Sequence, residues 1–246
     1  MASWPDNLPR SQTHPPVSIV TPTYNRGKFL PMLFECILQQ TYPRERMEWL
    51  IYDDGTASVE ALIPLFQTKF NIRYFRVESK TNIGSKRNRL HDEARGEIIV
   101  CMDDDDFYSA DRVSHAVQTI VSKKVDICGA SRNHLFFTDD ASIWEIGPYA
   151  PNHATFGTMA FRKQFTKDHR CDEHVVFAEE VDFTAKYTAR LAQLDPLKVM
   201  LVMCHSENTF NKHKLRTTDN PHIRKTALKL KHFIRVAKLR EFYSNA

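Results

Sequence analysis

The first half of the chain alternates short apolar runs with stretches whose apolar residues recur at helical spacing. The apolar runs, rich in β-branched and aromatic residues, lie at 17–20, 48–52, 72–77, 97–102 and 125–130. Helical patterns lie between them, at 28–40, 57–70, 85–94 and after Ser109, which we expect to cap its helix. Strands that alternate with helices of this length predict an α/β fold with a parallel, doubly wound sheet.

The second half has a different pattern, with shorter strands expected at 134–139, 142–146 and 155–161, a helix near 180–191 and a strand at 199–204. We therefore expect a smaller mixed sheet here. After His222, a C-terminal amphipathic helix is expected because Lys and Arg crowd one face and apolar residues form a stripe on the other. The stripe consists of Ile223, Ala227, Leu230, Ile234 and Ala237.

The predicted organisation is a disordered leader over 1–15, one domain over 16–212 and a basic helical extension over 213–246. The domain divides into a half over about 16–130 and a half over about 131–212. No run of eighteen apolar residues occurs, and the N-terminus lacks the apolar core of a signal peptide. These features favour a cytoplasmic location and leave open peripheral membrane contact through the C-terminal helix.

Composition excludes several other classes of protein. The five cysteines are scattered and contain no CxxC, which argues against a disulfide framework and against a zinc knuckle. A net charge of +4 permits an anionic ligand, and we expect no nucleic-acid partner.

Residues 97–108 read EIIVCMDDDDFY, so four aspartates stand directly after a predicted buried strand. Adjacent carboxylates repel one another, and a hard divalent cation would relieve that repulsion. The alternative is a solvated acidic turn that caps the next helix. Turn-rich stretches also follow the runs at 17–20 and 48–52, and in a doubly wound sheet such loops form the ligand crevice. After the second run, a carboxylate of Asp53 or Asp54 could accept hydrogen bonds from a nucleobase or ribose, although DDG is also a common turn.

Taken in order, these segments resemble the inverting family 2 glycosyltransferases, whose Rossmann-like, nucleotide-sugar-binding fold is called GT-A. The resemblance covers roughly residues 16–210 and rests on VSIVTPTYNR, EWLIYDDGT, NIGSKRNRLHDEARGEIIVCMDDDDFYSADR, FGTMAFRKQF and CDEHVVFAEEVDF. It implies a glycosyltransferase that moves a sugar from a UDP-, GDP- or dTDP-sugar to a hydroxyl acceptor on a glycan, glycoconjugate or lipid-linked molecule. It also implies Mn²⁺ or Mg²⁺ as cofactor and a single displacement with inversion.

The resemblance assigns roles to individual residues. Those expected around the nucleotide are Thr21, Pro22, Tyr24 and Arg26, with Asp54 on the base and Asn82 and Arg87 near the nucleotide or its phosphates. Those expected at the family's DXD metal motif are Asp103 and Asp105, with Asp105 as chief metal ligand and Asp104 near the ribose. His205 resembles a further metal contact, and a histidine that merely satisfies the core is the alternative.

The catalytic base is expected in the segment that contains Glu179 and Glu180. The family commonly has Glu-Asp here, so Glu180 occupies the position of the base and Glu179 is the second candidate. The alternative is that these acids and Asp182 stabilise a helix N-terminus.

Two other functions remain open from the sequence. A sugar-phosphate nucleotidylyltransferase also uses a doubly wound sheet and a metal, but TPTYNRGK has one glycine where a Gly-rich phosphate loop is usual. The second open function is a non-catalytic module that binds nucleotide sugars or a membrane surface.

Overall fold

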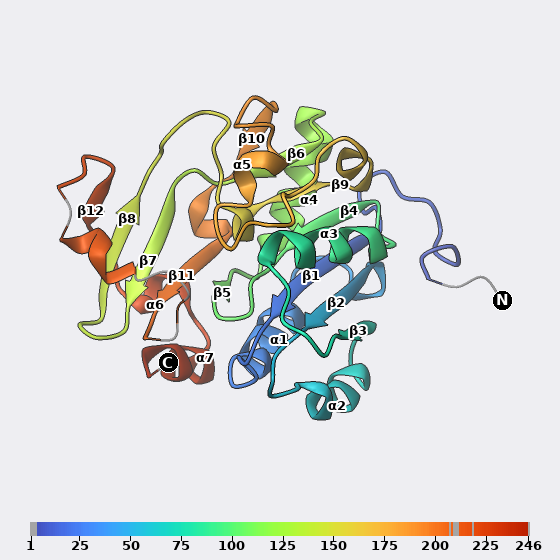
Figure 1. Ribbon diagram of the computed structural model, residues 1–246, viewed down its shortest axis with the longest axis horizontal. Coiled ribbons are helices and arrows are strands. Elements are labelled where there is room, and N and C mark those ends of the chain that lie inside the picture. The colour runs from blue at the N-terminus through green and yellow to red at the C-terminus, as the bar shows by residue number, and fades with distance from the viewer. Residues whose placement is uncertain (1–3, 207, 209–211, 218, 246) are drawn as a thin grey trace.

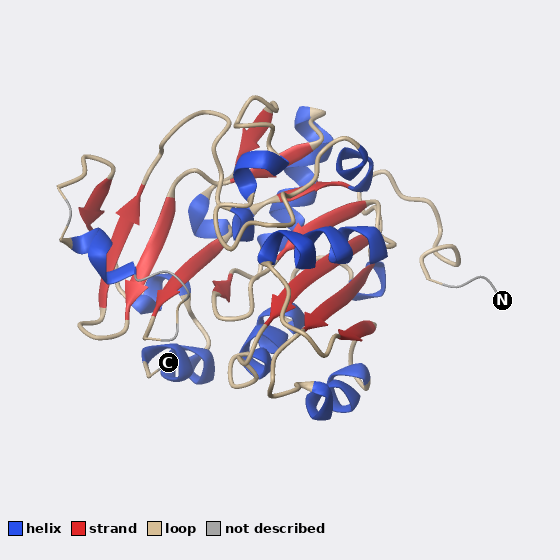
Figure 2. Ribbon diagram, viewed as in Figure 1, coloured by secondary structure: helices blue, strands red, loops and turns tan. Residues whose placement is uncertain are grey.

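The computed structural model describes residues 4–206, 208, 212–217 and 219–245. Two sheets form the molecule, and helices cover the larger one on both faces (Figure 1). The seven-stranded sheet has the order β10-β6-β9-β4-β1-β2-β3, and the five-stranded sheet has the order β12-β8-β7-β11-β5. Figure 2 shows the strands of the two sheets side by side across the molecule.

Four neighbouring parallel strands form one side of the larger sheet, and all four were expected from the sequence. They are β1 (Val17–Thr23), β2 (Met47–Asp53), β3 (Ile72–Arg76) and β4 (Ile98–Cys101). Alternate residues of each strand point to opposite faces of the sheet. Accordingly Val17 and Ile19 belong to one core cluster and Val20 to another. The sheet is therefore doubly wound, as predicted.

Each of these two core clusters contains residues from different helices. One contains buried residues of α1 (Leu30–Leu38), α2 (Ile63–Gln67) and α4 (Arg112–Lys123), and the other contains residues of α3 (Ile83–Glu93) and α5 (Glu180–Phe183). The helix expected at 180–191 is thus much shorter. Positive φ angles at Ala185, Lys186 and Tyr187 end it, because a helix needs negative φ.

The larger sheet is completed by β6 (Ile127–Gly129), β9 (Ala160–Arg162) and β10 (Leu191–Gln193). Strand β9 runs antiparallel between β4 and β6. Because β9 and β10 come after residue 130, the two halves expected from the sequence share one sheet.

The smaller sheet is mixed, as predicted. It contains β5 (Phe107–Tyr108), β7 (Asn133–Phe137), β8 (Ser142–Ile146), β11 (Met200–Cys204) and β12 (Ile223–Lys225). Strand β5 directly follows the four aspartates and pairs antiparallel with β11. This pairing brings the residues after β11 beside the acidic run.

The C-terminal segment is not the single amphipathic helix that the sequence predicted. Residues 223–225 instead form β12 on the edge strand β8, and two short helices follow, α6 (Leu230–Phe233) and α7 (Ala237–Ser244). Ile234 between them has extended backbone and is fully buried. Of the expected stripe, Leu230 and Ile234 are buried against the domain, whereas Ala227 and Ala237 are exposed. Burial of these larger side chains outweighs continuous helix formation.

The leader is also more ordered than predicted; its first three residues lie outside the described ones. Arg46 donates hydrogen bonds to the carbonyl oxygens of Pro9 and His14, at 2.7 and 2.9 Å, and Tyr42 donates one to Pro15. A buried guanidinium needs acceptors, and the leader supplies them.

Short 3₁₀ helices complete the fold: Arg44–Arg46, Glu60–Leu62, Phe156–Thr158, Lys163–Lys167, Pro196–Lys198 and Lys212–Arg216. Among the described residues, no helix has both the length and the apolar character needed to cross a membrane.

Candidate active site

A cavity of about 660 Å³ opens where the polar loops leave the carboxyl ends of β1 and β4. Its volume is in the usual range for a small-molecule site. The lining residues come from loops far apart in the sequence: 22–26, 80–83, 86–87, 103–106, 176–179, Asn208 and Lys212. The sequence analysis named Pro22, Tyr24, Arg26, Asn82, Arg87, Asp103, Asp104, Asp105 and Glu179 among them.

The four aspartates have different partners, which the sequence could not distinguish. Asp103 faces Arg87, whose guanidinium nitrogen lies 3.0 Å from Asp103 Oδ1. The backbone N–H of Asp103 donates to the hydroxyl of Tyr108 at 2.6 Å. A Cβ at Gly157 would lie 2.6 Å from Asp103 Oδ2, so glycine is needed here to leave room for the carboxylate.

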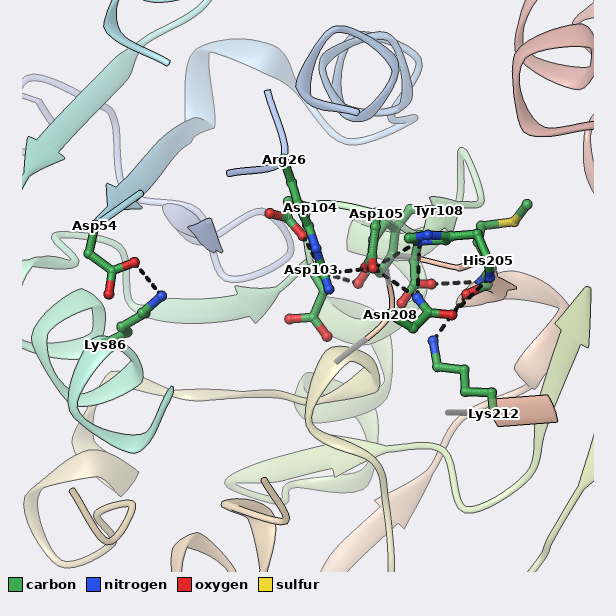
Figure 3. Close-up of polar contacts among 12 residues, drawn as sticks. Arg26, Asp54, Lys86, Asp103, Asp104, Asp105, Tyr108, His205, Asn208 and Lys212 are labelled. Atoms are coloured by element: carbon green, nitrogen blue, oxygen red, sulfur yellow. Dashed lines mark hydrogen bonds and ion pairs between the residues drawn. The ribbon is translucent and has the colours of Figure 1, made fainter. Parts of the chain in front are cut away.

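Asp104 and Asp105 share one cationic partner in the loop after β1 (Figure 3). The guanidinium of Arg26 donates to Asp104 Oδ1 at 3.1 Å and to Asp105 Oδ2 at 2.7 Å. Asp105 Oδ2 also accepts from Asn208 Nδ2 at 3.2 Å, and His205 Nε2 lies 3.2 Å away. Asp105 is therefore the most heavily contacted carboxylate of the run.

Asp106 has a structural role. Its Oδ1 accepts a 2.8 Å hydrogen bond from the backbone N–H of Met203 in β11. This bond fastens the acidic run to the strand that leads to His205, so the two parts of the site keep a fixed relation.

The four carboxylates do not carry four full charges. Burial and the neighbouring charge of Asp105 raise the pKa of Asp104 to about 7. Burial also raises the pKa of Asp106 to about 8, against the opposing charge of Lys212. Burial alone would raise the pKa of Asp105 too, but the hydrogen bond from His205 and the charges of Lys212 and Arg26 hold it well below its ordinary value. At neutral pH the run therefore has one firmly ionised acid beside two that take up protons readily.

Cationic side chains of α3 form another wall. Arg87 donates through Nε to Glu179 Oε1 at 2.8 Å and stacks on Phe156, 4.2 Å from its ring centroid. Lys86 pairs with Asp54, and burial lowers its pKa. Lys86 was not among the residues expected from the sequence; its position next to Arg87 near the start of a helix was the available signal.

Asp54 does not line the cavity, contrary to its expected place on the nucleobase. Its carboxylate accepts from the backbone N–H and hydroxyl of Thr81, at 2.6 and 3.0 Å, and pairs with Lys86. These side-chain contacts hold Thr81 and Lys86, which do line the cavity.

Tyr24 lines the cavity as expected, with the ammonium of Lys80 4.4 Å from its ring centroid. Thr21 does not line it. Its side chain is fully buried within β1, and its hydroxyl accepts a 2.9 Å hydrogen bond from Trp49 Nε1. The strand alternates its faces, so Thr21 points into the core.

The two candidate bases differ in environment. Glu179 lines the cavity, is buried, and accepts from Arg87. Glu180 lies at the start of α5, where burial, and then the charge of Glu179, raise its pKa to about 7. A carboxyl group with that pKa can accept a proton near neutral pH.

The donor atoms near Asp105 are of the kind that a divalent cation takes. Asp104 Oδ2 is buried without a hydrogen bond, and Asp105 Oδ2 and His205 Nε2 lie 3.2 Å apart, a spacing that suits two ligands each about 2 Å from one cation. Within the described residues, no three His, Cys, Asp or Glu side chains are grouped as a metal site. Arg26 contacts the same oxygen of Asp105 and would have to leave it.

Known proteins that are similar to this chain share one activity class. GlyG of Streptococcus pneumoniae, a glycosyltransferase, is 31% identical over 113 residues, which is 45% of this chain and 37% of GlyG. TarS of Staphylococcus aureus, a poly(ribitol-phosphate) β-N-acetylglucosaminyltransferase, is 25% identical over 112 residues, 45% of this chain and 20% of TarS. The chain thus spans well under half the length of either relative.

Solved structures share the fold. The mannosyltransferase PcManGT of Pyrobaculum calidifontis, bound to GDP-Man and Mn²⁺, superposes with a TM-score of 0.65 at 18% identity, covering 79% of this chain and 59% of that one. TarS residues 1–349 in complex with UDP-GlcNAc superpose with a TM-score of 0.63 at 19% identity, covering 78% of this chain and 60% of that one. The expected GT-A fold is therefore confirmed.

A model of Glycosyl transferase family 2 matches residues 18–180, which span β1, the acidic run and the Glu179–Glu180 pair. The match includes two thirds of the chain and most of the cavity wall described above. The chain therefore belongs to glycosyl transferase family 2.

Proposed function

We propose that this protein transfers a sugar from a nucleoside-diphosphate sugar to a hydroxyl group of a glycan or glycoconjugate. The main support is one cavity that joins cationic groups suited to a diphosphate with a cluster of carboxylates. Glu180, whose pKa is raised to about 7, does not itself line this cavity but directly follows Glu179, which does. Similar proteins are bound to UDP-GlcNAc and to GDP-Man, so a uridine or a guanosine nucleotide is the first choice of donor.

Binding of the donor depends on groups with opposite charges. Arg87 and Lys86 face the cavity and can each bind a phosphate oxygen, because phosphates bind favourably to guanidinium and ammonium donors. Tyr24 offers a ring face to a nucleobase. Asp104 and Asp105 can accept hydrogen bonds from ribose hydroxyls.

A divalent cation, Mn²⁺ or Mg²⁺, belongs to the same proposal. Asp105, Asp103 and His205 would hold it, and it would neutralise charge that develops on the departing diphosphate. Arg26 would then exchange its contact with Asp105 for one with a phosphate.

Glu180 is the proposed base, with Glu179 as the alternative. It takes the proton from the acceptor hydroxyl while that oxygen attacks the anomeric carbon, and the nucleoside diphosphate leaves from the opposite face. This is a single displacement with inversion. Glu179 is the weaker candidate because its carboxylate is already bound to Arg87.

The cytoplasmic location expected from the sequence fits the cysteines, which are all free and buried. Peripheral membrane contact has weaker support than the residue pattern suggested, because the expected amphipathic helix does not form.

A thermal-shift screen tests the proposal. UDP-, GDP- and dTDP-sugars, each with and without Mn²⁺, should raise the melting temperature for the donor that binds. Asp105→Ala should lose the Mn²⁺-dependent part of the shift. A chain that binds none of these donors, or that releases pyrophosphate from a nucleoside triphosphate and a sugar phosphate, would refute the proposed transfer.

A further inference from the structure

Helix α7 (Ala237–Ser244) lies outside residues 18–180 that the family model matches, yet it packs next to the acidic run. It contacts α1, the helix that follows the loop of Arg26 (Figure 1). Two of its side chains, Leu239 and Tyr243, are almost completely buried.

Tyr243 contacts the last residue of the acidic run and the residue that follows it. Its hydroxyl donates a 3.0 Å hydrogen bond to the carbonyl oxygen of Asp106. Its ring meets the ring of Phe107 edge to face, with centroids 5.9 Å apart. The side chain is fully buried, so water does not compete for the bond.

The other side of Asp106 is fixed as well, through the bond from Met203 N–H to its carboxylate. Strand β11 therefore holds the side chain of Asp106, while α7 holds its carbonyl. Asp104 and Asp105 immediately precede this anchored residue, so the anchor decides where their carboxylates point.

The same helix supports the histidine of the site through an aromatic chain. Phe242 meets Phe29 edge to face at 5.9 Å, and Phe29 packs on the ring of His205 at 4.8 Å. His205 in turn lies 3.2 Å from Asp105. Two consecutive residues of α7 thus connect to Asp105 by different contacts, Phe242 through Phe29 and His205, and Tyr243 through the adjacent Asp106.

We propose that α7 is a positioning element of the donor site, with Tyr243 as its principal positioning residue. The inference rests on the proposed function, because it assigns α7 a role in binding the nucleotide of the sugar donor. Without the Tyr243 hydroxyl, the buried carbonyl of Asp106 has no donor from α7, and the backbone of the acidic run relaxes.

The test compares Tyr243→Phe with Tyr42→Phe. Tyr42 is also buried, and its hydroxyl makes a 2.6 Å hydrogen bond to the carbonyl of Pro15, away from the cavity. Each change removes one buried hydroxyl-to-carbonyl bond, so both should lower the melting temperature by a similar few degrees.

Nucleotide affinity separates positioning from stability. Isothermal titration with UDP, GDP and dTDP in Mn²⁺, well below both melting temperatures, first identifies the nucleotide that wild type binds best. Its Kd should rise about three- to tenfold in Tyr243→Phe and stay within about twofold in Tyr42→Phe.

Equal affinity in wild type and both variants would overturn the role of α7. If wild type binds none of the three nucleotides, the proposed function itself fails, and the inference with it. If Tyr243→Phe does not fold, Phe242→Leu replaces it: weaker nucleotide binding supports the proposal, and unchanged binding overturns it.

Discussion

Replacing Glu180 with glutamine should remove activity and, above neutral pH, stabilise the fold. In the folded protein, burial and the charge of Glu179 raise the pKa of Glu180 from 4.5 to about 7. The folded state therefore binds this proton more tightly than the unfolded state. The resulting stabilisation is complete below about pH 4.5 and is lost as pH rises through about 7.

The size of the effect follows from the pKa. A rise from 4.5 to about 7 corresponds to about 3 kcal/mol, at about 1.4 kcal/mol for each pKa unit. Glu180 is only partly buried, so solvent screening reduces the expected gain for Glu180→Gln at pH 8 to about 1–3 kcal/mol. Near pH 4.5 the two proteins should have equal free energies of unfolding.

Sugar transfer by Glu180→Gln should fall, whereas its stability at pH 8 should rise. Glutamine cannot accept the proton, so kcat should fall by about 10²–10⁴ while the donor still binds. In wild type, kcat/KM should fall about tenfold per pH unit below 7, as the base becomes protonated.

The assays are urea unfolding at pH 4.5 and 8, nucleotide titration, and turnover across pH. Asp182→Asn, an exposed acid in the same short helix, is the matched control and should change none of them. Strong turnover in Glu180→Gln, or lower stability than wild type at pH 8, would refute the reasoning.

Three further changes test other parts of the site and core. Arg26→Met leaves Asp104 and Asp105 without their shared cation, so the free energy of unfolding should fall by about 2–4 kcal/mol at pH 8. The loss should be smaller at pH 6, where Asp104 is protonated, and urea unfolding at both pH values measures it. Gly157→Ala forces the carboxylate of Asp103 to move, so the Kd for the nucleotide should rise at least about tenfold in a calorimetric titration. An unchanged Kd would show that Asp103 does not contribute to donor binding. His91 has both ring nitrogens buried without hydrogen bonds, and burial holds its pKa well below 6.5, so wild type should lose stability as pH falls below about 6.5. His91→Phe should remove the part of that pH dependence that comes from His91 and stabilise the fold by about 1 kcal/mol or more; a destabilised variant at pH 8 would contradict this.

The chain order and residue pattern were enough to predict most of the larger sheet. Strands β1, β2, β3 and β4 lie where the sequence predicted them. The signal was strongest for β1, β2 and β4, because strands buried on both faces need a largely apolar sequence. The loops that follow β1 and β4 meet at one edge of the sheet because neighbouring parallel strands end on the same side. The residue pattern alone therefore predicts that the acidic run lies at this edge of the sheet.

The sequence misled where long-range contacts outweighed a local pattern. The apolar stripe after His222 has helical spacing, but β8 offers a free edge, and residues 223–225 pair with it instead. Thr21 lies in a motif that resembles a nucleotide-binding loop, but its position on β1 directs the hydroxyl to Trp49.

The sequence by itself determined that four carboxylates would stand at the end of a buried strand, because strand and turn signals are local. Only the tertiary structure decided how they divide their work. Arg87 pairs with Asp103, whereas Arg26 and His205 both contact Asp105, and all three partners lie outside the acidic run in the chain. A carboxylate's charge and direction depend on the partners that folding brings to it, and those partners are not encoded in the run itself.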